Sequence, residues 1–102
     1  MNKVEEFLKE TVPVNKYHNR KRLYCKDGFN LSIQSSDFHD CTDGISVEIG
    51  FPSEGEELLE QYAQNKSNLT NTVYGYVPYD VVNKVIELHK GIDWSKTIFG
   101  NG

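Results

Sequence analysis

The stretch RLYCKDGFNLSIQ (residues 22–34) restricts the fold of this chain more than any other segment. Asp27 and Gly28 separate two segments with alternating apolar residues, a pattern typical of a β-hairpin. A two-residue turn would put the apolar residues of the two strands on opposite faces. A three-residue loop with Gly28 in a left-handed conformation puts them all on one face, and we therefore expect this loop. The apolar residues are Leu23, Cys25, Phe29, Leu31 and Ile33. The polar residues left on the other face are Arg22, Tyr24, Asn30 and Ser32.

Two more segments alternate apolar and polar residues, as half-buried strands do. Residues 45–51 predict a third strand that ends at Pro52, with its apolar side chains on one face. Those side chains are Ile45, Val47, Ile49 and Phe51. Residues 72–77 predict a fourth strand, with its valines on one face and Tyr74 and Tyr76 on the other.

Three segments show helical spacing of apolar residues. Asn2 is a good N-cap for a short first helix that ends before Pro13. Ser53 and Glu56 form a capping box that predicts a second helix. Residues 81–89 repeat apolar side chains at helical intervals and predict a third helix, with its last residue, a histidine, as a capping or core-edge residue.

The elements follow the order α-β-β-β-α-β-α in a single domain of residues 1–102. Because the strands are half polar, we expect an α+β fold: a mainly antiparallel four-stranded sheet with helices packed on one face. The tail, residues 93–102, is too apolar to remain in water, so it either folds back or meets a partner. A chain of this length supports one hydrophobic core, and we expect a monomer or small homo-oligomer.

Charge is unevenly distributed along the chain, whose formal net charge is −4. Residues 16–26 contain five cations and no acid, whereas residues 27–65 contain nine acids and no lysine or arginine. We expect a dipolar surface, unless folding brings the two segments together.

The basic stretch predicts either phosphate contacts or a soluble sheet edge. In the first hypothesis, arginines donate paired hydrogen bonds to phosphate oxygens while aromatic side chains stack. In the second hypothesis, the charges only keep an edge strand in solution. The residues that would bind phosphate or nucleic acid are Lys16, Arg20, Lys21, Arg22 and Tyr24.

The acidic stretch also has two interpretations. Its carboxylates could imitate a phosphate backbone and occupy the basic channel of a partner protein. Separately, Tyr74 and Tyr76 could form an aromatic patch of the kind enriched at interfaces. Alternatively, the glutamates only favour the first turn of a helix, and a helix covers the tyrosines. The candidate partner-binding residues are Glu54, Glu56, Glu57, Glu60, Tyr74 and Tyr76.

We expect no catalytic residue, no cofactor and no metal. His39 and Cys41 lie in an aspartate-rich loop, but no second Cys or His pattern supplies the remaining ligands of a zinc site. The chain has no phosphate-binding loop, dinucleotide-binding fingerprint or nucleophile elbow. These observations predict a non-enzymatic protein.

The sequence predicts a cytoplasmic protein. The first residues, MNKVEEFLKE, interrupt their apolar positions with acids, unlike a signal peptide. No segment reaches the roughly 18 consecutive apolar residues of a membrane span, so we expect no membrane contact. In a reducing cytoplasm, Cys25 and Cys41 are expected to be free thiols.

The segments SVEIGFPSE (46–54) and TVYGYVPYDVVNKVIELHKGI (72–92) resemble those of small proteins encoded by phages and prophages of low-GC bacteria. The resemblance spans most of the chain and carries no catalytic motif. It implies localisation in the infected host and, by association, a counter-defence role such as anti-CRISPR inhibition.

Three functional hypotheses follow from these observations. The first is a non-enzymatic inhibitor that binds a host defence protein, such as a CRISPR nuclease, through charged surface. The second is a nucleic-acid-binding accessory protein that uses the basic stretch. The third is a protein that sequesters a small nucleotide signal, with arginines on its phosphates and a tyrosine stacked on its base.

Overall fold

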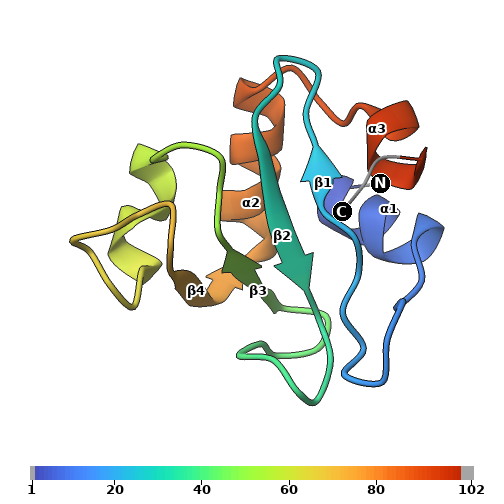
Figure 1. The fold of residues 1–102 in the computed structure, drawn as a ribbon, viewed down its shortest axis with the longest axis horizontal. Coiled ribbons are helices and arrows are strands. Elements are labelled where there is room, and N and C mark those ends of the chain that lie inside the picture. Colours follow the sequence, from blue (N-terminus) through green and yellow to red (C-terminus); the bar gives the residue numbers. More distant parts are fainter. Residues whose placement is uncertain (1, 100–102) are drawn as a thin grey trace.

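The sheet has four antiparallel strands that follow one another in chain order, β1-β2-β3-β4. The computed structural model describes residues 2–99, so part of the tail, residues 100–102, lies outside the described residues. Figure 1 shows the elements in the order α-β-β-β-η-β-α-α, where η is a 3-10 helix. Their bounds are α1 Lys3–Glu10, β1 Leu23–Tyr24, β2 Asn30–Gln34, β3 Ser46–Gly50, η1 Glu57–Tyr62, β4 Val73–Pro78, α2 Tyr79–Leu88 and α3 Trp94–Phe99. The expected α+β fold is confirmed.

The hairpin has the expected register. Leu23 pairs with Leu31, and Tyr24 pairs with Asn30. Gly28 occupies a left-handed conformation with φ of 99° at the end of the three-residue loop. This conformation is open to glycine without the steric penalty of a side chain. The apolar side chains of both strands are therefore buried together.

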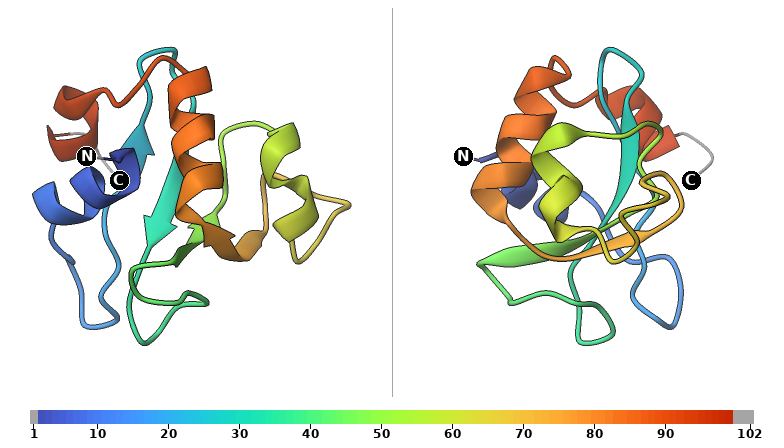
Figure 2. Two further views of the ribbon diagram at one scale, coloured as in Figure 1. Left: turned by 180° about the vertical axis from the view of Figure 1, so that it is seen from behind. Right: turned by 90° about the vertical axis from the view of Figure 1, so that its left-hand side faces the viewer.

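The core lies between the sheet and the helices. Figure 2 shows α2 lying along one face of the sheet with α1 beside it. Helix α1 contributes Val4 and Phe7, and α2 contributes Val82, Val85 and Ile86, all of them fully buried. Helix α1 begins as expected, because the side chain of Asn2 accepts a hydrogen bond from the backbone of Glu5.

The tail folds back onto the outer edge of β1 and forms α3. The backbone N–H of Tyr24 donates to Thr97 Oγ1 at 3.0 Å, and the backbone N–H of Asp93 donates to the Tyr24 carbonyl at 2.8 Å. The tail thus pairs backbone groups at the outer edge of β1 that would otherwise face solvent, and charged residues flank the same edge. No helix among residues 2–99 is long and apolar enough to cross a membrane.

The expected faces of the fourth strand are wrong. Val47 pairs with Val77 and Ile49 pairs with Tyr74, so β4 has one residue more than β3 between these pairs. The extra residue forms a bulge at which Tyr76 has a φ of 54°, and its N–H donates to the carbonyl of Asp40. Tyr74 therefore points into the core, while Tyr76 is 57% exposed.

The two ends of the third strand also differ from the alternating pattern. Ile45 is 65% exposed and Phe51 is 46% exposed, so neither belongs to the core. Phe51 turns out of the sheet in a left-handed conformation with φ of 48°. Only the central Val47 and Ile49 keep the predicted burial.

The second helix is a 3-10 helix, and Ser53 does not cap it. The Ser53 hydroxyl accepts a hydrogen bond from the backbone of Asn30, while Glu56 caps η1 by accepting from the N–H of Leu58. A 3-10 helix repeats every three residues, so Leu59 and Tyr62 lie on the side of η1 that packs against the core. Leu59 is buried, whereas Leu58 is 40% exposed.

The positions of the two isoleucines give a direct test of the third strand. We expect Ile49→Ala to lower the free energy of unfolding by about 2–5 kcal/mol, because it leaves a cavity in the core. The matched change Ile45→Ala should stay within about 0.5 kcal/mol of the parent protein. Urea denaturation of both variants measures the difference, and equal effects would contradict the observed burial.

Candidate anion-binding groove

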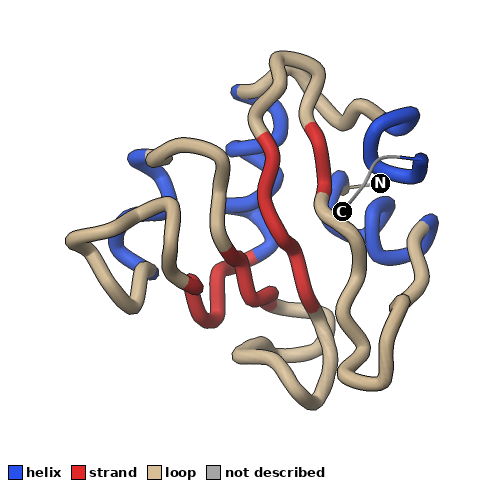
Figure 3. The backbone as a smooth tube through the Cα atoms, in the orientation of Figure 1, coloured by secondary structure: helices blue, strands red, loops and turns tan. Residues whose placement is uncertain are grey.

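A groove opens between the segment of residues 14–22 and the polar face of the sheet, with a volume of about 500 Å³. The segment supplies three consecutive cations, and β2 and β3 supply polar side chains. The lining residues that matter below are Asn19, Arg20, Lys21, Arg22, Gln34, Glu48 and Phe51. Long loops border this part of the molecule (Figure 3), so its shape depends on how those loops are held.

Gln34 fixes the segment to the sheet. Its Oε1 accepts from the backbone N–H of Arg20 at 2.6 Å, and its Nε2 donates to the Arg20 carbonyl at 2.9 Å. Continuing the pairing of Leu23 with Leu31 by three residues in each direction places Arg20 opposite Gln34. The Gln34 amide therefore takes the place of a backbone ladder pair beyond the end of β1.

Asn15 and His39 hold the preceding loop. Asn15 Oδ1 accepts from the backbone N–H groups of Tyr17 at 3.0 Å and Asn19 at 3.1 Å. His39 Nε2 lies 2.6 Å from Asn19 Oδ1, and His39 Nδ1 lies 2.5 Å from Ser36 Oγ. These side chains connect two loops far apart in sequence, so one wall of the groove is formed before any ligand arrives.

Arg20 is a cation without a matching anion. Its Nε is buried and has no hydrogen-bond partner among the described residues. All ion pairs found in residues 2–99 involve His89, so no carboxylate pairs with Arg20 there. Burial lowers the pKa of this guanidinium, but an arginine remains charged at neutral pH. The groove is thus lined by an arginine whose charge no carboxylate of residues 2–99 neutralises.

The guanidinium of Arg22 forms hydrogen bonds within the protein and is therefore only partly available to a ligand. Its Nε donates to Asn30 Oδ1 at 2.9 Å, and its Nη2 donates to the carbonyls of Asn30 at 3.2 Å and Phe51 at 2.5 Å. Burial lowers its pKa, and the nearby Tyr24 acts in the opposite direction. Arg22 therefore adds positive charge to the groove while fixing the position of Phe51.

The basic candidates are only partly brought together. Arg20, Lys21 and Arg22 line the groove. Lys16 is outside the lining, with its Nζ 5.2 Å from the ring centre of Tyr17. Tyr24 lies on the same face of β1 as Arg22 but does not line the groove.

The acidic candidates are divided between surface and interior. Glu54, Glu57, Glu60 and Tyr76 are exposed. Glu56 is 8% exposed, and its carboxylate is occupied by the η1 backbone and by His89. Tyr74 is fully buried, and its hydroxyl donates to the carbonyl of Leu69. Two of the six residues expected at a partner surface are therefore internal.

Sequence reasoning missed three residues that shape the groove. Gln34 was expected only as the last residue of a strand, and nothing in its neighbourhood signals a bond to Arg20 fourteen residues earlier. Asn19 likewise carries no local signal for its contact with His39. Phe51 continued the alternation of the third strand and was expected in the core.

His89 joins three parts of the chain at the C-cap of α2. Its Nδ1 lies 2.7 Å from Asp27 Oδ2, its Nε2 lies 2.8 Å from Glu56 Oε1, and its ring stacks on Phe29 with centres 4.0 Å apart. Burial opposes the charged imidazolium, but the hydrogen bonds to Glu56 and Asp27 outweigh it and raise the pKa of His89. This cluster ties the hairpin loop and η1 to α2, in keeping with the expected capping role.

The described residues include no group of three or more His, Cys, Asp or Glu side chains that could hold a metal ion. Both cysteines are free thiols. Burial, with a smaller contribution from Asp27, raises the pKa of Cys25 to about 12. The Cys25 thiol therefore has little nucleophilic thiolate at neutral pH.

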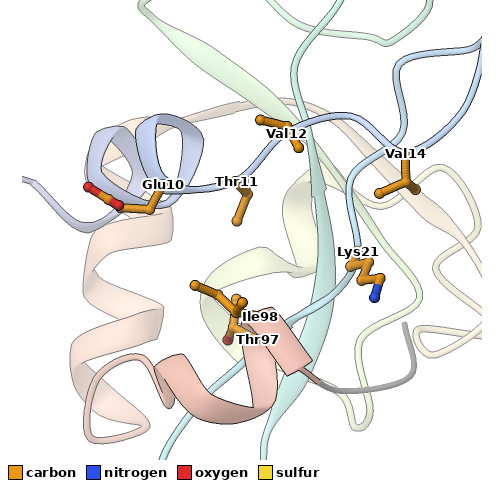
Figure 4. Close-up of a pocket in the computed structure, with 7 residues that line it drawn as sticks. All are labelled: Glu10, Thr11, Val12, Val14, Lys21, Thr97 and Ile98. Carbon is orange, nitrogen blue, oxygen red and sulfur yellow. The ribbon is translucent and has the colours of Figure 1, made fainter.

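A second, smaller pocket of about 230 Å³ lies between the C-terminal end of α1 and α3 (Figure 4). Thr11, Val12, Thr97 and Ile98 line it, and Lys21 lies on its far side from Glu10. The pocket combines aliphatic and hydroxyl groups with one cation and one carboxylate, and Arg20 is not among its lining residues.

No protein-family model, curated protein or solved structure matches this chain.

The His89 cluster predicts a pH dependence of stability. Folding raises the pKa of His89 above its ordinary value of about 6.5. The charged imidazolium therefore contributes fully to the free energy of unfolding below about pH 6.5, and this contribution is lost as the pH rises through the raised pKa. We expect His89→Ala to lower the free energy of unfolding by about 1–3 kcal/mol at pH 6, since it leaves buried Glu56 without its partner.

The difference between parent and His89→Ala should shrink from pH 6 to pH 9, as measured by thermal unfolding at each pH. His18→Asn is the control, because His18 is exposed and asparagine tolerates its left-handed φ of 61°. A difference that stays constant over this range would show that the charge of His89 does not stabilise the fold.

Proposed function

We propose that this protein is a non-enzymatic nucleic-acid-binding accessory protein that holds backbone phosphates in the groove. The observation that carries the proposal is the Arg20 guanidinium, whose buried Nε has no partner among the described residues. A buried donor left without an acceptor costs about 1–3 kcal/mol. A phosphate in the groove would pair with the charge of this guanidinium, and a turn of the side chain toward the ligand would let Nε donate as well.

The neighbours of Arg20 support a phosphate rather than a neutral ligand. Lys21 and Arg22 line the same groove, and neither forms an ion pair with a carboxylate of residues 2–99. Asn19 and Ser32 add polar groups of the kind that accompany arginine at phosphate contacts. Backbone phosphates, repeated along a strand, would use several of these groups together.

The net negative charge of the chain does not oppose this function, because Glu48 is the single acid among the described residues that line the groove. Residues 14–22 lie on one side of the sheet, while η1 with Glu57 and Glu60 lies on the other (Figure 1). At physiological salt the screening length is about 8 Å, so a phosphate in the groove responds mainly to nearby charges.

The first test replaces the two cations that have no structural role. We expect Arg20→Gln with Lys21→Gln to weaken binding of a short oligonucleotide at least about tenfold and to reduce the salt slope of log affinity by about 2. Fluorescence anisotropy across a salt series measures both quantities. The control, Lys9→Gln with Lys84→Gln, removes the same charge from exposed positions on α1 and α2. Equal losses in the two variants would contradict a localised site.

Glu48 gives a test in the opposite direction. It lines the groove, and its Oε2 accepts from the backbone of Asp40 at 2.9 Å, a bond that glutamine can also accept. We expect Glu48→Gln to strengthen oligonucleotide binding about three- to tenfold at low salt, because it removes a repulsive charge. The control Glu87→Gln, exposed on α2, should leave affinity unchanged. Weaker binding by Glu48→Gln would place the ligand elsewhere.

A second candidate function is inhibition of a host defence protein such as a CRISPR nuclease, in line with the resemblance to phage proteins. It is favoured by the exposed carboxylates of Glu54, Glu57 and Glu60, none of which pairs with a cation of the described chain. Failure to bind oligonucleotides, together with loss of nuclease inhibition on reversing these charges, would support this candidate over the first. Sequestration of a small nucleotide would use the same groove as the first candidate.

A further inference from the structure

Phe51 has a backbone conformation and an exposure that core packing does not explain. Its φ of 48° lies in the left-handed region, which is unfavourable for a residue with a large side chain. Phe51 is 46% exposed as a residue and lines the groove together with the three cations. A glycine would adopt this backbone without strain, so the side chain itself needs a reason.

Hydrogen bonds on both sides hold Phe51 in this position. Its N–H donates to the carbonyl of Thr72 at 3.0 Å, and its carbonyl accepts from Arg22 Nη2 at 2.5 Å. The next residue, Pro52, is buried, and the N–H of Ser53 donates to the Asn30 carbonyl at 2.8 Å. The ring is therefore presented at the groove by fixed backbone on either side.

We propose that Phe51 stacks on a base of single-stranded nucleic acid while Arg20 and Lys21 bind the adjacent phosphates. This inference rests on the proposed function and names its substrate class. A cationic groove with an aromatic platform is the arrangement that single-strand-binding proteins use, since every base offers a face for stacking. A duplex keeps its bases stacked on one another and offers none to Phe51. The groove volume of about 500 Å³ suits one nucleotide unit and its phosphates.

Tyr76 provides a matched control for Phe51. It is also an exposed aromatic residue with a left-handed backbone, with φ of 54° and 57% exposure. Its N–H donates to the Asp40 carbonyl, and it lies outside the groove lining. Replacing either residue by leucine removes an exposed ring from the same kind of backbone, but only one of the rings faces the cations.

The experiment compares a short oligothymidylate with an abasic oligomer of the same length, both measured by fluorescence anisotropy at fixed salt. We expect the parent protein to bind oligothymidylate about tenfold more tightly. Phe51→Leu should lose about tenfold in affinity for oligothymidylate and bind the abasic oligomer as before. Tyr76→Leu should change neither affinity, and the Arg20→Gln, Lys21→Gln double variant should weaken both.

The outcomes separate this inference from the proposed function. Equal binding of the two oligomers, or an unchanged affinity in Phe51→Leu, overturns stacking but leaves phosphate binding in place. No binding of either oligomer by the parent protein overturns the proposed function itself. Phe51→Gly excludes unfolding as the cause, because relief of the left-handed strain should keep its melting temperature at or above that of the parent while oligothymidylate affinity falls.

Discussion

The register of the β1–β2 hairpin is the constraint on which the rest of the structure depends. It buries Leu23 and Leu31 as a pair and thereby sends Arg22 and Asn30 to the opposite face. A shift of one residue would exchange the two faces, exposing the apolar set and burying an arginine. Burial of a few aliphatic side chains thus determines where the positive charge of this protein is displayed.

Hydrogen bonds from polar side chains hold segments together where the short strands provide no backbone pairing. Strand β1 has only two residues, and the Gln34 amide extends its pairing to Arg20. His39 joins two loops on one side of the molecule, and His89 joins α2 to the hairpin loop and η1 on another. In a domain of this size, such contacts supply order that the hydrophobic core alone provides only in part.

The two aromatic residues with left-handed backbones mark the places where regular strand geometry ends. Tyr76 sits in the bulge of β4, and Phe51 turns the chain out of β3. The N–H of Tyr76 donates to the carbonyl of Asp40 in a distant loop, and the N–H of Phe51 donates to the carbonyl of Thr72, one position beyond the pairing of Gly50 with Val73. The strain is thus held by contacts from distant parts of the chain.

The sequence by itself determined the order of the elements from α1 to α2, the hairpin register, the cap of α1 and the helical character of α2, because each depends on neighbours within a few residues. It did not predict that the tail forms α3. Periodicity could not reveal the bulge that buries Tyr74, since the extra residue is defined only by pairing with β3. Nor could it reveal the 3-10 form of η1, whose cap Glu56 is shared with His89, 33 residues away.

Some features of the candidate site could also be predicted from the sequence, and others could not. The sequence located the cationic segment and its polar strand face, since charge and alternation are read directly from the chain. Only the tertiary structure decided that Arg20 has no carboxylate partner among the described residues and that Phe51 lines the groove. The hydrogen bonds by which Gln34 and Asn19 shape the groove are likewise tertiary contacts. The physical reason is that each of these properties depends on segments that are distant in sequence and become neighbours only when the chain folds.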